Sequence, residues 1–189
     1  MFTISASRMR EHARAVLAAV LAAATIAAAQ AADRPGWPAG GDGSWAPVGS
    51  GTMRWLGFEL YEASLWTEGG APWVAARPFA LRIEYRRPIS SQRLVSASLQ
   101  EMARLGYAEP DQLARWESEL QRAFPAVEAG DVIVGVAQPG RGAAFYHRGA
   151  LTAEVRDERF VEAFFGIWLD ERTREPALRT RLLGSGDEG

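Results

Sequence analysis

The feature that most constrains the fold is a series of three short apolar segments, 132–136, 144–147 and 151–155, separated by very short turns. The turns are 138–142, which contains Pro and Gly, and 148–149. Connections this short join only antiparallel neighbours, because a parallel pair needs a crossover of about a dozen residues or more. The sequence therefore predicts an antiparallel meander in this part of the chain.

The other segments predict one further strand and several helices. Residues 79–85 alternate between apolar and charged side chains, which is typical of a strand with one solvated face. Helical stripes follow helix start signals in three places: after Ser90-Ser91, after Pro110-Asp111 and after Asp157. Pro176 is suited to begin a last short helix that ends near residue 183. Runs of strands followed by runs of helices predict an α+β fold rather than a doubly wound sheet.

The N-terminal segment has the composition of a secretory signal peptide. Residues 8–14 contain three arginines, residues 15–29 are almost entirely apolar, and 29–31 read Ala-Gln-Ala, a small-residue cleavage site. We therefore predict a signal peptide over 1–31 and a periplasmic or secreted protein, with an uncleaved anchor as the alternative. A flexible leader over 32–47, one domain over 48–183 and a disordered tail over 184–189 complete the predicted organisation.

Composition excludes several kinds of site. The chain has no cysteine, so neither a disulfide framework nor a thiolate metal site can form. The formal net charge is −2 and the charges are interleaved, which argues against a nucleic-acid partner. His147 has no other imidazole near it, so no metal site is expected, and its role as an axial haem ligand is a minor alternative. We expect no cofactor.

The segment 49–65 predicts a strand with one cation among its apolar positions. Counting by twos from Arg54 gives Leu56, Phe58 and Leu60, so an unbroken strand would place the guanidinium on the buried face. Burying an arginine is costly without an anionic partner, so the placement predicts a cavity that receives a carboxylate or a phenolate. The apolar phase shifts after Leu60, which predicts a bulge, bend or turn close to that residue.

The order and spacing of several motifs resemble the chalcone isomerase-like family, in its exported bacterial branch. The motifs cover residues 49–183, nearly all of the predicted mature chain. They are Gly49-x-Gly51-x-x-Arg54-x-x-Gly57-x-x-x-Tyr61-x-Ala63-x-Leu65, Phe124-Pro125 with Gly130-Asp131, Gln138-Pro139-Gly140 with Phe145 and Gly149, and Phe164-Phe165-Gly166-Ile167-Trp168-Leu169 with Thr173 and Pro176.

This resemblance implies an open-faced β-sandwich, in which helices pack on one side of a large antiparallel sheet and a ligand cleft lies between them. The plant enzymes of the family close a chalcone into a flavanone with an arginine on an early strand, assisted by a tyrosine, a lysine, an asparagine and a hydroxyl residue. Arg54 matches that arginine, with one more residue between glycine and arginine here. The chain contains no lysine and no asparagine, so the full catalytic set cannot be present and no catalytic residue is predicted.

Non-catalytic relatives of this fold bind fatty acids through an arginine and a tyrosine, and this function is the one we expect. A small amphipathic anion would be held by Arg54 and Tyr61 or Tyr85, because an arginine gives a carboxylate two charge-assisted hydrogen bonds. Arg93 stands near the position of the enzymes' lysine. The predicted ligand-binding residues are Arg54, Tyr61, Tyr85, Arg93, Leu94, Leu99, Met102, Trp116 and Phe164.

Several alternatives stay open. Arg54 could form a strand-end ion pair with Glu59 or Glu84, and the two tyrosines and the 164–168 aromatic cluster could be ordinary core. An intramolecular lyase or isomerase acting on a phenolic or enone substrate is the second function, and a structural accessory protein is the third. The arginines at 86–87 and 172–181 also allow association with an anionic membrane surface. The oligomeric state is not predicted.

Overall fold

The computed structural model describes residues 45–185, and these form a single antiparallel sheet with helices on one face. The predictions for the signal peptide, and for most of the leader and tail, lie outside the described residues. The six strands pair in chain order, β1 with β2 through to β5 with β6. Their bounds are β1 Trp45–Trp55, β2 Phe58–Glu68, β3 Phe79–Tyr85, β4 Val132–Gln138, β5 Gly142–His147 and β6 Ala150–Val155.

The helices begin and end at the signals that the sequence contains. Ser90 caps α2 (Ser91–Leu105), and Gly106 ends it in the left-handed conformation with φ 78°. Pro110 opens α3 (Pro110–Ala123), and the Asp157 carboxylate accepts hydrogen bonds from two backbone N–H groups of α4 (Glu158–Leu169). Pro176 begins α5 (Pro176–Leu182). The predicted meander, α+β class and one-sided helical layer are therefore confirmed.

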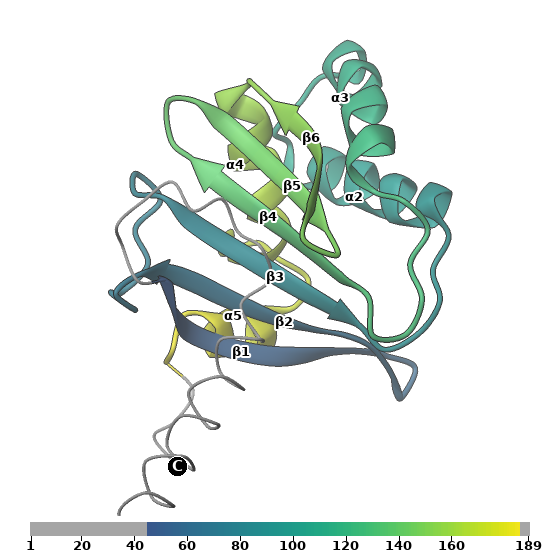
Figure 1. The fold of residues 1–189 in the computed structure, drawn as a ribbon. Helices are drawn as coiled ribbons and strands as arrows, with labels where there is room; N and C mark the ends of the chain where they lie inside the picture. Colours follow the sequence, from purple (N-terminus) through teal and green to yellow (C-terminus); the bar gives the residue numbers. More distant parts are fainter. Residues whose placement is uncertain (1–44, 186–189) are drawn as a thin grey trace, which may run out of the picture. The chain divides into compact units, whose positions relative to one another are not determined.

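The helices and the sheet form two layers; in Figure 1, α4 and α5 lie behind the strands, and α2 and α3 lie toward the β6 edge. α5 packs on β1, α4 on β5, and α3 against β6. α2 lies beside α3 and α4. Among residues 45–185, no helix is long and apolar enough to span a bilayer.

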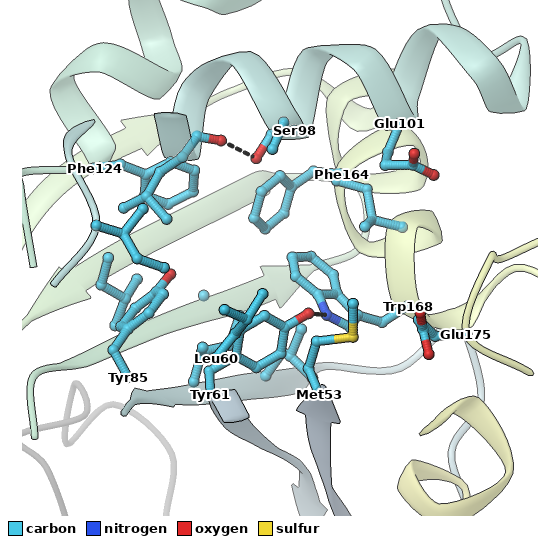
Figure 2. A pocket seen from close by; sticks show the side chains of 18 of the residues that line it. Met53, Leu60, Tyr61, Tyr85, Ser98, Glu101, Phe124, Phe164, Trp168 and Glu175 are labelled. Atoms are coloured by element: carbon cyan, nitrogen blue, oxygen red, sulfur yellow. Dashed lines mark hydrogen bonds between the residues drawn. The ribbon is translucent and has the colours of Figure 1, made fainter. Parts of the chain in front are cut away.

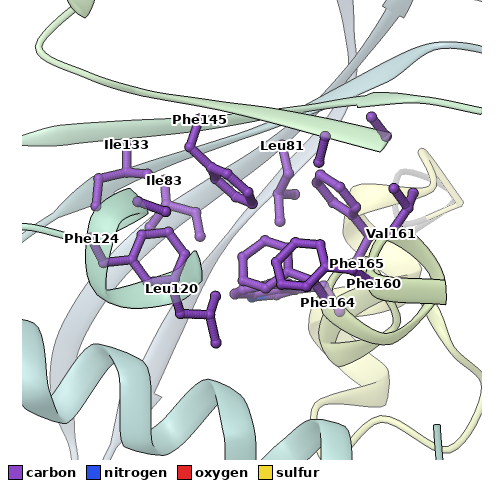
Figure 3. Packing of buried hydrophobic residues seen from close by; sticks show 14 of the residues in the cluster. Leu81, Ile83, Leu120, Phe124, Ile133, Phe145, Phe160, Val161, Phe164 and Phe165 are labelled. Carbon is purple, nitrogen blue, oxygen red and sulfur yellow. The ribbon is translucent and has the colours of Figure 1, made fainter. Parts of the chain in front are cut away.

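Aromatic side chains fill the space between the layers at the α4 end (Figure 3). Phe160 and Phe164, one turn apart on α4, stack with an interplanar angle of 1°, and Phe145 of β5 meets both rings edge-on. Phe145 and Phe160 are completely buried. Edge-to-face packing of this kind adds to the free energy gained from burial, so this cluster stabilises the contact between α4 and the sheet.

Two glycines of β1 allow α5 to lie directly on the strand. A Cβ atom at Gly49 would stand 2.0 Å from the carbonyl oxygen of Arg181, and one at Gly51 would stand 2.7 Å from a methyl carbon of Leu178. Only a residue without a side chain fits at Gly49, where the contact is with backbone, whereas a Cβ atom at Gly51 would require the Leu178 and Arg181 side chains to move. The glycines of the Gly49-x-Gly51 motif are thus explained by helix packing.

Domain boundaries differ slightly from the predicted ones. β1 begins at Trp45, so 45–47 belong to the sheet rather than to a flexible leader. Gly184 and Ser185 donate backbone hydrogen bonds to the end of α5, so the first two residues of the predicted tail are ordered.

Candidate ligand-binding site

A pocket of about 640 Å³ opens between the sheet and helices α2 and α4. Figure 2 shows α2 above it, α4 at one side and the strands below. The lining is mainly apolar, with a few polar and charged groups at the edges. It consists of Met53, Trp55, Leu60, Tyr61, Leu81, Ile83, Tyr85, Ile89, Arg93, Leu94, Ala97, Ser98, Gln100, Glu101, Phe124, Ile133, Gly135, Phe145, Phe164, Ile167, Trp168, Thr173, Arg174 and Glu175.

Alternation along the strands determines which side chains enter the pocket from the sheet. On β3 the odd-numbered residues face the helices, and Leu81, Ile83 and Tyr85 all line the pocket. Tyr61 of β2 pairs with Tyr85, so the two phenols lie side by side on the pocket floor, with ring centroids 6.1 Å apart. The two hydroxyl groups are the polar groups that the sheet brings into the apolar part of the pocket.

The hydroxyl of Tyr61 is tied to α4 by a hydrogen bond. The indole Nε1 of Trp168 donates to the Tyr61 oxygen at 3.0 Å (Figure 2). Burial raises the pKa of Tyr61 to about 12, against a smaller opposing effect of the Trp168 hydrogen bond. The phenol therefore stays protonated at neutral pH and can donate its proton to an acceptor in the pocket.

The hydroxyl of Tyr85 has no hydrogen-bond partner within residues 45–185. Only 5% of Tyr85 is exposed, and Figure 2 shows its hydroxyl pointing away from the sheet into the pocket. Burial raises the pKa of this phenol well above its usual value, so it too is a neutral donor. A hydrogen-bond donor that faces an apolar pocket without a protein partner is a candidate ligand contact.

The charged groups are distributed unequally between the two ends of the pocket. At the Trp168 end, Glu101 pairs with Arg174 at 3.2 Å and with Arg104 at 2.8 Å, and Glu175 forms no ion pair in the described part of the chain. Arg93, on the first turn of α2, is exposed and forms no ion pair within residues 45–185. In the described part of the chain, the Trp168 end therefore carries one uncompensated acid, Glu175, while the beginning of α2 carries an uncompensated cation.

The prediction that Arg54 enters the cleft is wrong. Its guanidinium is 60% exposed and pairs with Glu59 at 2.6 Å, which is the alternative considered from the sequence. β1 ends at Trp55, and the chain reverses through Leu56 and Gly57, which have φ values of 50° and 81°. The alternation counted from Arg54 to Leu60 therefore crosses a turn. The reversal also lies three to four residues before Leu60, near which the bend was predicted.

Five of the predicted contacts line the pocket, namely Tyr61, Tyr85, Arg93, Leu94 and Phe164. Besides Arg54, three others do not. Met102 is completely buried in the core, and Leu99 packs against that core without lining the pocket. Trp116 packs on Phe160 and donates to Asp157 at 2.9 Å, so its indole connects α3 to the cap of α4. The apolar positions of the helices were predicted correctly, but these positions face the core as well as the pocket.

The sequence interpretation missed several lining residues. Trp168 was assigned to plain core, although its indole holds the Tyr61 hydroxyl. Trp55 and Met53 were missed because the inward positions of β1 are odd-numbered, the same as those of Gly49 and Gly51. That glycine spacing was the available signal. His147 does not line the pocket; its Nε2 lies 3.5 Å from the Asp131 carboxylate.

Comparison with known proteins agrees with this architecture. The model of a family described as chalcone isomerase-like matches residues 48–184. The chain belongs to the chalcone isomerase-like family. An uncharacterized protein of Haemophilus influenzae is similar to this chain in sequence. The two are 29% identical over 140 residues, which are 74% of this chain and 68% of that protein.

A solved structure shows the same chalcone isomerase-like fold. The crystal structure of a fatty-acid binding protein from Arabidopsis thaliana matches with a TM-score of 0.60, at 13% sequence identity. The match covers 79% of this chain and 92% of the plant protein. At this level of identity the similarity concerns the fold, and the chemistry of the site must be argued from its own residues.

Proposed function

We propose that this protein binds a fatty acid or a similar amphipathic carboxylate without catalysing a reaction. The observation that carries the proposal is the hydroxyl of Tyr85, which has no partner within residues 45–185 and faces an apolar pocket of about 640 Å³. Pockets of this size hold small organic ligands, and each methylene removed from water contributes about 0.8 kcal/mol. The fold shared with a fatty-acid binding protein supports the same ligand class.

The carboxylate head lies at the Tyr85 end of the pocket, beneath the beginning of α2. Tyr85 supplies a neutral donor there, and Arg93 supplies a cation that no acid within residues 45–185 neutralises. At the opposite end Arg104 and Arg174 neutralise Glu101, and Glu175, which has no ion-pair partner within residues 45–185, would repel an anion. The acyl tail then runs along Leu94, Phe164 and the apolar side chains of the sheet.

The alternatives have less support. The lyase or isomerase function depended on Arg54 stabilising a developing oxyanion, and Arg54 lies outside the pocket. A structural accessory protein would have its cleft filled by side chains, whereas this pocket is open. Location outside the cytoplasm is proposed on the composition of residues 1–31 alone. Intact mass measurement of the protein recovered from the periplasm tests it: a mass that retains residues 1–31 would contradict cleavage.

Mass spectrometry of ligands extracted from purified protein tests the binding function. We expect an acyl carboxylate in the wild type, and a rise in its melting temperature on addition of fatty acid. Tyr85→Phe and Arg93→Ala should each weaken binding by about 1 to 2 kcal/mol, because each removes one hydrogen-bond donor to a charged group. Arg54→Ala is the matched control and should bind like the wild type.

The outcomes separate the proposals. If the wild type carries no acyl ligand and added fatty acid leaves the melting temperature unchanged, the binding function is excluded. A loss of binding in Arg54→Ala equal to that in Arg93→Ala would contradict the assigned location of the head group. Turnover of a phenolic enone would replace binding by catalysis as the function.

A further inference from the structure

Three large apolar side chains are exposed together at the turn between β1 and β2. Trp55 is 62% exposed, Leu56 75% and Phe58 58%. Only two other large apolar residues in the described part of the chain are comparably exposed, Val74 and Leu151. The three lie within four consecutive positions, and Figure 1 shows this turn projecting past the end of β3. We call residues 55–58 the apolar tip.

The backbone of the tip is not the one that its sequence favours. Leu56 has a φ of 50°, a region in which glycine and asparagine are the usual residues of a two-residue hairpin turn. The same turn between β5 and β6 uses Arg148 with φ 50° followed by Gly149. There the side chain forms an ion pair with Asp131, whereas the Leu56 side chain is left in water. Neither local geometry nor core packing accounts for leucine at this position.

Two of the three arginines near the tip are neutralised by acids, and Arg87 is the exception. Arg54 pairs with Glu59, and Arg86 pairs with Glu62 and Glu84. Arg87 lies over the ring of Phe58, with its Cζ 4.8 Å from the ring centroid, and it forms no ion pair within residues 45–185. Aromatic side chains beside arginine are suited to the boundary between lipid headgroups and acyl chains, where the ring is buried and the cation meets phosphate.

The tip is continuous with the pocket. Trp55 both lines the pocket and is 62% exposed, so it forms part of the pocket rim. Arg93 is on the same rim, as an exposed residue that lines the pocket. A surface that contacted the tip would therefore lie next to the pocket opening.

We propose that the apolar tip docks the protein on a bilayer that contains anionic phospholipid. Leu56 and Phe58 enter the acyl region, Trp55 lies at the level of the headgroups, and Arg87 meets a lipid phosphate. The tip is a projecting turn of four residues, far smaller than the roughly 800 Å² per partner that a stable protein interface buries. A bilayer needs no matching surface of that size, which is why lipid is the occupant the tip fits.

Docking itself does not depend on what fills the pocket, but its role does. Under the proposed function, an acyl chain would pass between bilayer and pocket beside Trp55 without crossing water. That role rests on the proposed function, so the two are tested separately.

Vesicle sedimentation tests docking with the full chain. We expect the wild type to sediment with vesicles of phosphatidylcholine and phosphatidylglycerol and much less with phosphatidylcholine alone. The double substitution Leu56→Ser and Phe58→Ser should lower partitioning at least about tenfold, because each side chain loses its apolar transfer free energy. Leu151→Ser removes a leucine of similar exposure on β6 and should leave partitioning unchanged.

The charge contribution is tested in the same assay. Arg87→Ala should reduce binding to the anionic vesicles by about fivefold, since one arginine near a membrane surface contributes about 1 kcal/mol. The control is Arg156→Ala, which should bind like the wild type. Arg156 is 85% exposed and directly follows β6, at the edge of the sheet opposite β1. Equal losses for Arg87→Ala and Arg156→Ala would show attraction by overall charge and overturn the assignment to the tip.

The absence of cysteine allows a direct readout of insertion. An environment-sensitive fluorophore on Leu56→Cys should shift to shorter wavelength on anionic vesicles, and the same fluorophore on Leu151→Cys should not. If neither label shifts and the wild type stays in the supernatant, docking is excluded. Tight association with a protein in place of vesicles would also overturn the lipid assignment.

A final comparison separates docking from ligand binding. The Leu56→Ser and Phe58→Ser protein should keep its affinity for added fatty acid while losing its affinity for vesicles. If the wild type binds vesicles but does not bind fatty acid, the proposed function alone is refuted. The reverse result would refute docking alone.

Discussion

The hydroxyl of Tyr61 is the polar link between the pocket floor and helix α4. It accepts a hydrogen bond from Trp168, which is 8% exposed. Tyr61→Phe would leave the indole N–H of Trp168 buried without an acceptor, so we expect a loss of about 1 to 2 kcal/mol in the free energy of unfolding. Urea denaturation measures it. Tyr146→Phe, a half-buried tyrosine outside the pocket, is the control, and equal losses in both variants would contradict the account.

Asp131 gives the domain a specific dependence on acid. Its carboxylate accepts hydrogen bonds from Arg148 at 2.7 Å and from the backbone of Glu128 at 2.8 Å. These contacts, the Arg148 one foremost, lower its pKa from 3.8 to about 2. A depressed folded-state pKa stabilises the protein above the unfolded pKa, and that stabilisation is lost as pH falls from about 3.8 to about 2.

Asp131→Asn should therefore destabilise the domain at neutral pH, and the difference from wild type should shrink across that acidic window. Urea unfolding at a series of pH values measures the difference. Asp111→Asn, on the exposed first turn of α3, is the surface control. A difference that stays constant down to pH 2 would mean that the ion pair contributes nothing.

At the scale of single residues, the sequence indicated which residue types belong to the site but not which way each side chain points. Tyr61, Tyr85 and Arg93 were selected through the resemblance to the fatty-acid binders and enzymes of the family, and all three line the pocket. The orientation of Arg54 could not be obtained, because counting by twos holds only inside one strand. Trp168 was missed since its role depends on a tyrosine more than a hundred positions earlier in the chain.

In the β1–β2 hairpin, Leu56 affects both the stability of the domain and the apolar surface that the turn exposes. Leu56→Asn places a residue suited to positive φ at the first turn position, so the free energy of unfolding should rise by about 1 kcal/mol. Vesicle binding should fall in the same variant. Denaturation and sedimentation measure the two effects. A gain in stability with unchanged vesicle binding would mean that Leu56 does not enter the bilayer.

Elements were predicted well where their signals are local. Ser90, Asp157 and Pro176 mark helix starts in the sequence, and the caps are found at those residues. The β1–β2 turn was placed too late because Leu56-Gly57 lacks the asparagine or aspartate that usually marks such turns. Its only local signal was the glycine.

At the scale of the whole domain, the contact between β1 and α5 closes the structure. Gly49→Ala would drive a methyl group into the backbone of α5, so we expect a loss of about 2 to 4 kcal/mol in the free energy of unfolding. Ser50→Ala, at the neighbouring exposed position, should change it little. Thermal unfolding compares the two. Equal stability of the two variants would mean that α5 shifts freely on the strand.

The meander and the α+β class could be predicted because short turns impose antiparallel pairing and strands and helices occur in separate runs, whereas the one-sided helical layer came from the family resemblance. The pocket could not be located from periodicity. An apolar helix position is the same in sequence whether it faces core or cavity, as Met102 and Leu94 show. Only the packing distance between layers decides which of them meets a ligand.

The closeness of β1 and α5 also brings the two ends of the domain together. Gly184 follows α5, and a Cβ atom there would stand 2.9 Å from the carbonyl oxygen of Val48. A short linker from 185 to 45 could therefore join the ends, and a circular permutant opened in the loop between β2 and β3 should keep the fold. In the natural chain order, the helix that covers the first strand is the last element to be synthesised, so the ribosome must complete nearly the whole domain before that strand is covered.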